Sequence, residues 1–543
     1  MTYILGISGG FRLGYQDAAA VLVSDGMVVA AIEEERLSRV KHAPSVMPYF
    51  AIKEVLQIAG ISIEQVAEVA THGITWGDEY REDVRQYFIT YFGFCPKLSF
   101  WHHHMAHAAG AFYSSGFSES MILTLDNSGD GISTQLAVGK GQSIEVVEQY
   151  ARPQSLGIFY SSLTQYCGFK KESDEYKLMG LAAYAKGHNY DLSPLLSISQ
   201  GHYKLDDEYI FTFQPGRPQP SQQQRLYSDK LSELVGTPPR IPGSEISDNY
   251  IQLAAATQEK FEEALISLVQ YLHEKTGLRS ICLSGGAALN CVANGKIAKL
   301  DFIDEIYVQP AASDAGIAMG AAQLASANNG NVPASVASTY LGREFSDSDI
   351  LKILKLTNVS FKKIENVAKE AAKYLAQDKV IGWFQGRAEF GPRALGNRSI
   401  LASATKKEMV NTINQKIKFR ESFRPFCPAV LEEGCQRFFD VKKTSSPYMT
   451  ITFPSKPLAL DLIPAAVHAD GSARIQTVTK EMNELFYNLL TEYKQVSGVG
   501  VVLNTSFNRN NEPIVDSPVD ALSTFFGSGL DALFIGNYLV LKS

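Results

Sequence analysis

Two glycine-rich turns that directly follow apolar, strand-like stretches constrain the fold of this chain most strongly. Residues 121–125 are apolar and run into the turn 126–131, and residues 280–283 run into the turn 284–290. Glycine has no Cβ, so such turns let backbone N–H groups approach a phosphate closely. The candidate nucleotide-binding residues in these turns are Gly129, Asp130, Gly285, Gly286 and Asn290.

A predicted hairpin near the start of the chain precedes these turns. Strands are expected at residues 3–8, 18–23 and 27–32, with a Gly-containing loop at 9–16. Two phosphate loops on hairpins, followed by a later nucleotide loop, are the order of the actin/sugar-kinase-type ATPases. The sequence has no GxxxxGK[ST] motif and no GxGxxG motif after its first strand, which argues against P-loop and Rossmann folds. We predict an α/β protein with an ATPase-like N-terminal domain.

A pair of histidines and two aspartates form a candidate metal site. His103 and His107 lie four residues apart in an Ala-rich stretch, so a helix would place both imidazoles on one face. Asp126 and Asp314 each follow a predicted strand, where α/β proteins collect ligand-binding side chains. Two imidazoles and two carboxylates suit iron, manganese or zinc. The alternatives are a structural histidine patch and a simple turn role for Asp126, and His104 is expected to point elsewhere.

The last third of the chain holds three segments rich in Arg, Lys, Asn and Ser. They cover residues 386–399, 416–426 and 504–508. Arg and Lys bind phosphates and carboxylates, and hydroxyl and amide groups can orient them. Because aromatic and Pro residues alternate with the cations, we predict a packed, cation-lined pocket in preference to a solvated basic surface.

Length and charge restrict the class of protein further. With 543 residues, we expect more than one domain and place the boundary near 355–365, with domains at 1–355 and 365–543. The formal charge of −7 disfavours binding to nucleic acid. Six cysteines without a CxxC pair indicate a reduced, cytoplasmic protein. No signal-peptide pattern and no apolar run near ~20 residues are present, so no membrane contact is expected.

The chain resembles the NodU/CmcH-type carbamoyltransferases, which include O-carbamoyltransferases of antibiotic and nodulation-factor pathways. The resemblance extends over nearly the whole chain and depends on eight motifs in one order. These motifs lie at residues 17–20, 34–36, 103–108, 177–182, 285–291, 389–398, 420–426 and 504–508.

The resemblance implies two enzymatic parts in series. The first is similar to the tRNA threonylcarbamoyltransferase, and the second resembles the α/β YrdC fold, which makes carbamoyl adenylates. The second domain would convert carbamoyl phosphate and ATP, with Mg²⁺, to carbamoyl-AMP. The first would transfer the carbamoyl group to a small-molecule acceptor, expected to be a hydroxyl.

The resemblance also assigns roles to individual residues. The catalytic positions are Arg393, Lys418, Arg424 and Asp17, and the further cofactor-binding positions are Lys177, Asn504 and Ser506. The metal ligands are His103, His107, Asp126 and Asp314, with Fe²⁺ expected first and Mn²⁺ or Zn²⁺ as the alternatives.

One position departs from the family pattern. Members usually have His immediately before Asp17, and this chain has Gln16. That His would be a general base for the acceptor hydroxyl, and Gln cannot act as a base near neutral pH. Three explanations stay open: Tyr15, His42 or His72 takes the role, the acceptor is an amine, or the transfer chemistry of the first domain is altered.

Two other functions are alternatives to the carbamoylation of a small molecule. The first is carbamoyl transfer to tRNA, which the acidic net charge disfavours. The second is a non-catalytic nucleotide-binding regulator, which the complete set of motifs in the second domain disfavours. The acceptor itself stays open, with the insertion at residues 190–245 as a candidate for its binding, and so does assembly into a homodimer.

Overall fold

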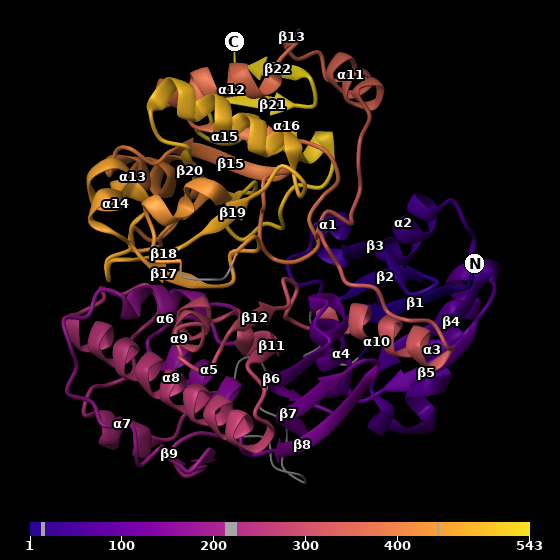
Figure 1. Cartoon of the computed structure of the whole chain (residues 1–543), viewed down its shortest axis with the longest axis vertical. Coiled ribbons are helices and arrows are strands. Elements are labelled where there is room, and N and C mark those ends of the chain that lie inside the picture. The colour runs from indigo at the N-terminus through magenta and orange to yellow at the C-terminus, as the bar shows by residue number, and fades with distance from the viewer. Residues whose placement is uncertain (12–16, 212–224, 442–444, 543) are drawn as a thin grey trace. The chain divides into compact units, whose positions relative to one another are not determined.

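The computed structural model describes residues 1–11, 17–211, 225–441 and 445–542 (Figure 1). Two compact units are distinguished by their internal contacts. The first contains residues 1–6, 25–27 and 67–335, and the second contains residues 7–24, 28–66 and 336–543. The predicted sequence domains, 1–355 and 365–543, stay a prediction.

The early strands form a five-stranded sheet in the order β3-β2-β1-β4-β5. Its strands are β1 (Tyr3–Ser8), β2 (Ala19–Ser24), β3 (Met27–Glu33), β4 (Val66–His72) and β5 (Lys97–Trp101). β4 and β5 are parallel. The three strands expected at the start of the chain are thus present, each within one residue of its predicted bounds.

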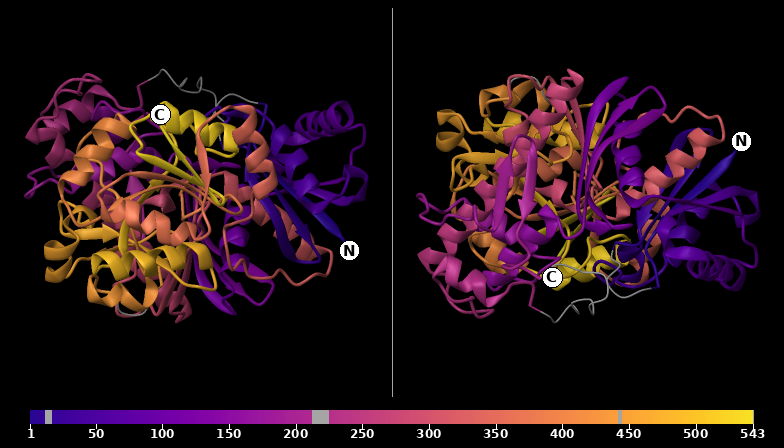
Figure 2. Two further views of the ribbon diagram at one scale, coloured as in Figure 1. Left: turned by 90° about the horizontal axis from the view of Figure 1, so that it is seen from above. Right: turned by 90° about the horizontal axis from the view of Figure 1, so that it is seen from below.

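A second five-stranded sheet has the equivalent order, β12-β11-β6-β7-β8. Its strands are β6 (Glu119–Gly129), β7 (Ile132–Lys140), β8 (Ser143–Ala151), β11 (Ser280–Ser284) and β12 (Glu305–Val308). β6 to β8 form an antiparallel meander whose long strands lie side by side in Figure 2, and β11 and β12 extend it in parallel from the β6 edge. Two sheets with this repeated order are the arrangement of an actin/sugar-kinase-type ATPase, as predicted.

Helices α4 (His103–Ser115) and α10 (Ala315–Asn328) approach each other closely in the first unit. A Cβ built on Gly320 would lie 1.7 Å from the carbonyl oxygen of Ala106, and one on Gly110 would lie 3.1 Å from that of Gly316. Only glycine allows two helix backbones to come this near. The contact brings the first turn of α4 beside the residue that precedes α10, Asp314.

The first unit contains further helices and strands. They are α3 (Gly77–Phe92), α5 (Leu156–Tyr166), α6 (Glu175–Ala182), β9 (Leu196–Ser199), β10 (His202–Leu205), α7 (Asp229–Val235), α8 (Asp248–Thr276) and α9 (Cys291–Ile297). The long helix expected at residues 250–276 is α8, and the small-residue helix expected at 316–327 is α10.

The second unit contains an eight-stranded mixed sheet in the order β13-β22-β21-β14-β15-β20-β16-β19. Its strands are β13 (Phe361–Lys363), β14 (Ile381–Phe384), β15 (Arg398–Ser403), β16 (Cys427–Leu431), β19 (Gln476–Val478), β20 (Val501–Ser506), β21 (Ala532–Ile535) and β22 (Tyr538–Leu541). β14 is parallel to β21 and antiparallel to β15. The whole chain therefore has the predicted α/β fold class.

Helices cover this sheet, with α12 and α15 packed against each other (Figure 1). The remaining elements of the unit are α1 (Glu34–Ser38), α2 (Tyr49–Ala59), α11 (Asp347–Leu356), α12 (Val367–Ala376), α13 (Glu408–Ile413), β17 (Thr452–Pro454), α14 (Pro457–Leu462), β18 (Ser472–Arg474), α15 (Glu484–Ser497) and α16 (Pro518–Phe526). The buried indole of Trp383 on β14 donates a 2.8 Å hydrogen bond to the carbonyl of Gly396. That bond fixes the Arg- and Gly-rich loop against the sheet.

None of the helices in the described ranges combines the length and apolar character that a membrane crossing requires.

Candidate functional site

Two histidines of helix α4 share one buried face. His103 and His107 are four residues apart, so one helical turn places one ring above the other. Both side chains are buried. Asp130 Oδ2 accepts the backbone N–H of His103 at 2.8 Å, which satisfies one of the unpaired donors at the start of the helix. The helix therefore begins at the first of the two candidate ligands.

Two carboxylates face these rings. Asp126 Oδ2 lies 3.3 Å from His103 Nε2 and 3.2 Å from His107 Nε2. Asp314 Oδ1 lies 3.8 Å from each of the same nitrogens. One ligand atom from each of the four residues lies within 4.8 Å of all the others. The structure thus brings together the four residues predicted as metal ligands, and two imidazoles with two carboxylates fit one divalent cation.

Neighbouring groups orient the imidazoles. His107 Nδ1 lies 3.2 Å from Ser284 Oγ, and when Nδ1 donates to that hydroxyl, Nε2 turns its lone pair toward the carboxylates. His104 is directed elsewhere, as expected: its Nδ1 lies 2.7 Å from Thr124 Oγ1 and its Nε2 lies 3.0 Å from the carbonyl of Ile132. Of the three histidines of α4, therefore, His103 and His107 face Asp126 and Asp314, and His104 does not.

The electrostatics of the cluster favour a bound cation. Burial lowers the pKa of His107, but hydrogen bonds with Asp126 and Asp314 and their charges outweigh it and raise the pKa to about 9. Burial raises the pKa of Asp126, but its bonds with His103 and His107 hold that pKa well below its usual range. Burial and the charge of Asp126 raise the pKa of Asp314. Two buried carboxylates repel each other unless a positive charge lies between them.

Gly129 and Asp130, predicted to contact a nucleotide, both support His103. A Cβ on Gly129 would lie 2.0 Å from Cγ of the His103 ring, so only glycine leaves room for that imidazole. Asp130 also accepts a hydrogen bond from the Thr75 hydroxyl. The structure accounts for both residues through the histidine, and their contact with a nucleotide stays a prediction.

Gly285 and Gly286 follow β11 beside the same cluster. Gly285 has φ of +90°, and a Cβ there would lie 2.0 Å from the carbonyl oxygen of Leu125. A Cβ on Gly286 would lie 3.4 Å from Asp126 Oδ1. The turn therefore packs against the segment that carries a metal-ligand candidate, which is a position from which its backbone could also meet a phosphate.

Asn290 and Lys177 have structural partners in the first unit. Asn290 Oδ1 accepts the N–H of Ala293 at the start of α9, and its amide exchanges two hydrogen bonds, 2.9 and 3.1 Å, with Gln258. Lys177 Nζ lies 3.1 Å from Asp174 Oδ2. Their contact with a nucleotide stays a prediction.

In the second unit, Lys418 is a buried cation surrounded by oxygen atoms. Its Nζ donates to Ser506 Oγ at 3.2 Å, to the Asn508 carbonyl at 3.0 Å and to Asn508 Oδ1 at 2.6 Å, and also to the Ser506 carbonyl. Burial and the charges of Arg420 and Arg424 lower the pKa of Lys418 well below its usual range. Three cations that disfavour one another's charge form a ready site for an anion.

Asn414, which the sequence did not single out, organises this basic turn. It is buried at the start of the π-helical turn Asn414–Lys418, and its Oδ1 accepts from Arg420 Nε at 2.6 Å. Its Nδ2 donates to the carbonyl of Arg424 at 3.1 Å. Arg420 also lies over the ring of Phe426, 4.4 Å from its centroid, so the predicted packing of aromatic residues against the cations is present.

The other candidates in the second unit connect to Lys418 through the sheet. Asn504 and Ser506 lie two residues apart on β20, and Ser506 contacts Lys418 directly. Asn504 Nδ2 donates to Gln476 Oε1 at 2.8 Å, and Gln476 Nε2 donates to the carbonyl of Leu395 at 2.7 Å. Gln476 thereby fixes the loop that also carries the half-buried Arg393. Gln476 has no sequence signal that would have distinguished it.

Asp17 pairs with His42 in the second unit. Asp17 Oδ1 lies 2.8 Å from His42 Nδ1, and the N–H of Asp17 donates to the carbonyl of His42 at 2.7 Å. Of the two described candidates to replace the family histidine, His42 and His72, His42 is thus in contact with Asp17. Tyr15 and Gln16 lie outside the described residues.

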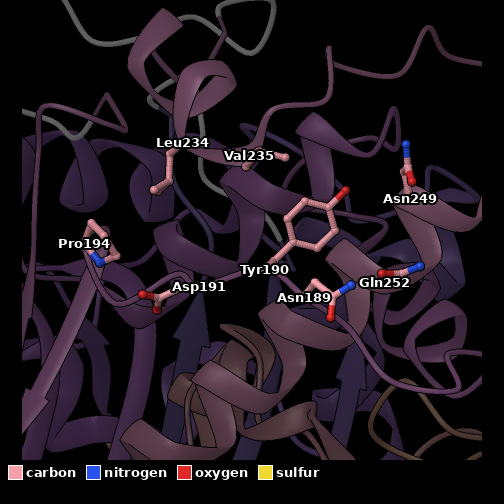
Figure 3. Close-up of a pocket in the computed structure, with 8 residues that line it drawn as sticks. All are labelled: Asn189, Tyr190, Asp191, Pro194, Leu234, Val235, Asn249 and Gln252. Atoms are coloured by element: carbon pink, nitrogen blue, oxygen red, sulfur yellow. The ribbon is translucent and has the colours of Figure 1, made fainter.

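A side-chain-lined hollow lies elsewhere in the first unit (Figure 3). Its volume is about 480 Å³, and it is lined by Asn189, Tyr190, Asp191 and Pro194, by α7 at Leu234 and Val235, and by α8 at Asn249 and Gln252. Except for Asn189, the first two groups belong to the insertion at 190–245 that the sequence suggested for acceptor binding. Amide groups, a phenol and the carboxylate of Asp191 supply its polar lining.

Two family models match the chain. The model described as the carbamoyltransferase N-terminus matches residues 74–323, and the one described as the carbamoyltransferase C-terminus matches residues 372–542. Both candidate clusters, the one around His103 and the one around Lys418, lie within these ranges.

Similar sequences match over most of the chain. The nodulation protein NolNO of Sinorhizobium fredii is 36% identical, and the match covers 99% of this chain and 82% of that protein. The nodulation protein NolO of Bradyrhizobium diazoefficiens is 35% identical over 81% of this chain and 78% of that protein. Among solved structures, full-length HypF in its phosphate- and nucleotide-bound form is 13% identical, with a TM-score of 0.34, and the match covers 62% of this chain and 56% of HypF.

Proposed function

Because the chain belongs to the carbamoyltransferase family, we propose that it uses carbamoyl phosphate and ATP to carbamoylate a small-molecule acceptor. The observation that carries the proposal is the presence of two separate built sites, one in each family-matched region. One cluster presents imidazoles and carboxylates, and the other presents cations. Cations can stabilise the charge that develops during adenylation, and a metal held by the other cluster can assist the transfer.

The first step activates the carbamoyl group. Water splits carbamoyl phosphate into carbamate and phosphate, and a carbamate oxygen then attacks the α-phosphorus of ATP, which releases pyrophosphate and leaves carbamoyl-AMP. Lys418, Arg393 and Arg424 would offset the negative charge on the phosphates as these bonds form. Asn504 and Ser506 would orient the substrates, and Mg²⁺ would accompany ATP.

The anchoring of Lys418 supports this assignment. Its ammonium is buried and already receives four oxygen contacts, so its position is fixed before a substrate binds. Burial, followed by the charges of Arg420 and Arg424, lowers the pKa of Lys418, and a phosphate placed beside these three residues would offset the part due to the two arginines. Preorganised charge of this kind stabilises a transition state without reorganisation.

The second step transfers the carbamoyl group. The acceptor oxygen attacks the carbonyl carbon of carbamoyl-AMP, the new C–O bond forms, and AMP leaves. His103, His107, Asp126 and Asp314 would hold a divalent metal, with Fe²⁺ proposed first and Mn²⁺ or Zn²⁺ as alternatives. When bound, that metal would supply Lewis-acid stabilisation of the adenylate phosphate and the carbonyl.

The test follows the products of each step. Purified protein is incubated with carbamoyl phosphate, ATP and Mg²⁺, and pyrophosphate and AMP are measured, while mass spectrometry of added metabolites detects a gain of one carbamoyl group. Pyrophosphate that depends on carbamoyl phosphate supports adenylation. If neither pyrophosphate nor AMP forms, the enzyme is not what we propose, and the alternative of a non-catalytic nucleotide-binding regulator is favoured. Carbamoylation of amines alone would support the amine-acceptor alternative.

A further inference from the structure

The side-chain amide of Asn414 makes contacts of opposite kinds at its two ends. Its Oδ1 accepts from Arg420 Nε at 2.6 Å, and its Nδ2 donates to the carbonyls of Arg424 at 3.1 Å and Ser422 at 3.4 Å. Arginine nitrogens only donate and carbonyl oxygens only accept, so these partners fix the orientation of the amide. Because Asn414 is fully buried, water does not compete for these bonds.

The backbone of Asn414 holds the same turn. Its carbonyl accepts the N–H of Phe419, the hydrogen bond over five residues that defines a π-helical turn, and also the N–H of Arg420 at 3.1 Å. Between these two bonds Phe419 has a φ of +47°, an unfavourable conformation for an aromatic residue. Strained backbone of this kind persists only where the surrounding structure imposes it, and it concentrates at functional sites. Asn414 thus maintains the sharp reversal of the chain that follows Lys418.

These contacts arrange the cations of the proposed adenylation site, all within the second unit. Lys418 is the last residue of the π-helical turn that Asn414 begins. The charges of Arg420 and Arg424 act on Lys418, so the three cations lie near enough to share one anion. Arg420 is held at its Nε by Asn414 and lies over the ring of Phe426. Asn414 therefore determines how the three cations are placed relative to one another.

We propose that Asn414 is a positioning residue of the adenylation step and that it acts through Arg420 and Arg424. The inference rests on the proposed function. In that step a carbamate oxygen bonds to the α-phosphorus of ATP, and the bond from that phosphorus to pyrophosphate breaks. The negative charge that moves onto pyrophosphate is stabilised best by cations that are already in place. Loss of Asn414 leaves all three cations present but misaligned, so the rate of the step should fall more than the affinity for ATP.

The experiment separates rate from binding. Carbamoyl-phosphate-dependent ATP–pyrophosphate exchange gives kcat and the KM for ATP, and calorimetry with Mg²⁺–ATP alone gives its Kd. Asn414→Ala should lower kcat by ~10- to 100-fold, since a misplacement of about 1 Å can cost that much. KM and Kd should stay near their wild-type values, because the positive charge that attracts ATP is retained.

A double variant tests whether Asn414 acts through Arg420. If it does, Asn414→Ala should lower kcat less in an Arg420→Ala background than in the wild type, because one group that it positions is already absent. Asn414→Asp serves where Asn414→Ala does not fold. It keeps the volume and the acceptor for Arg420, but its other oxygen faces the carbonyls of Ser422 and Arg424, so kcat should fall here too.

The matched control is an asparagine that holds backbone elsewhere in the same unit. Asn366 Oδ1 accepts the N–H of Lys369 at 2.9 Å at the start of α12, so Asn366→Ala removes a helix cap and should lower stability without changing kcat. The proposal is overturned if folded Asn414→Ala and Asn414→Asp keep the wild-type kcat, if KM rises with kcat unchanged, or if the two losses multiply in the double variant. A wild-type protein without the exchange would instead overturn the proposed function.

Discussion

The backbone N–H of Gly391 donates a 2.6 Å hydrogen bond to the carboxylate of Glu33, although 358 residues separate them. Arg36 completes the contact from the other side, since its NH2 donates to the Gly391 carbonyl at 2.6 Å. Gly391 lies two residues before Arg393, one of the proposed catalytic cations. The buried end of β3 and the helix α1 thus fix the loop that carries that cation.

The protonation of Glu33 should make the stability of the protein depend on pH. Burial outweighs the charge of Arg36 and raises the pKa of Glu33 from 4.5 to about 7. The folded state therefore binds a proton more tightly than the unfolded state does, and the stabilisation is complete below pH 4.5 and is lost as pH rises to 7. At ~1.4 kcal/mol per pKa unit, the loss is about 3 kcal/mol.

The variant Glu33→Gln keeps an oxygen that can accept from Gly391 and removes the titration. Denaturant unfolding at pH 5 and at pH 8 should show the free energy of unfolding of the wild type falling relative to that of Glu33→Gln by an amount of this order. Parallel pH profiles for the two proteins would show that Glu33 is ionised in the folded state throughout.

Loss of Arg424 should stop adenylation. Arg424 lies beside Lys418, and its backbone carbonyl is bound by the amide of Asn414. Arg424→Ala should lower carbamoyl-phosphate-dependent ATP–pyrophosphate exchange by ~10²- to 10³-fold, as loss of one preorganised charge-stabilising group does. Arg437→Ala, which removes an exposed cation of the same unit, is the control. Normal exchange in Arg424→Ala would place the adenylation site elsewhere.

Loss of Asp126 should stop the transfer step and leave adenylation intact. Asp126 Oδ2 faces both candidate histidine ligands. Asp126→Asn should weaken metal binding by more than the ~10–100-fold that loss of an outer-shell partner costs, and it should block transfer to the acceptor while exchange continues. Metal titration followed by calorimetry gives the affinity, with Asp78→Asn, at a fully exposed surface aspartate, as the control. Equal loss of exchange and transfer would contradict the assignment of two sites.

Local patterns in the sequence predicted part of this site. The i,i+4 spacing located His103 and His107, and the apolar stretches before Asp126 and Asp314 located their carboxylates, because the ends of parallel strands meet at one edge of a sheet. The predicted turn at 126–131 is not fully present: β6 continues to Gly129, with a register shift after Leu125. Sequence patterns alone did not predict the role of Gly129. Close approach of a phosphate and close approach of an imidazole both require a residue without a Cβ, so the sequence does not distinguish the two roles.

Contacts between distant segments could not be predicted in this way. The order of strands in the eight-stranded sheet brings Asn504, Gln476 and Leu395 together. Glu33 at the end of β3 and Gly391 in the loop between β14 and β15 belong to segments of different sheets. Neither spacing nor hydrophobic periodicity encodes such pairs. Of the two described candidates for the base, His42 differs from His72 by its contact with Asp17.

The close contact of α4 with α10 should couple helix packing to metal binding. A Cβ on Gly320 would lie 1.7 Å from the carbonyl oxygen of Ala106, which sits between His103 and His107 on α4. Gly320→Ala must therefore push the helices apart, at a cost of ~1–3 kcal/mol or more in the free energy of unfolding, which outweighs the better helix propensity of Ala. Because Asp314 immediately precedes α10, the same shift separates the carboxylate from the imidazoles, so metal affinity should fall as well.

Gly434→Ala, where a Cβ meets open space, should change neither the free energy of unfolding nor the metal affinity. Denaturant unfolding and metal titration of both variants measure the two effects, and a destabilised Gly320→Ala with wild-type metal affinity would show that the cluster does not depend on this helix contact.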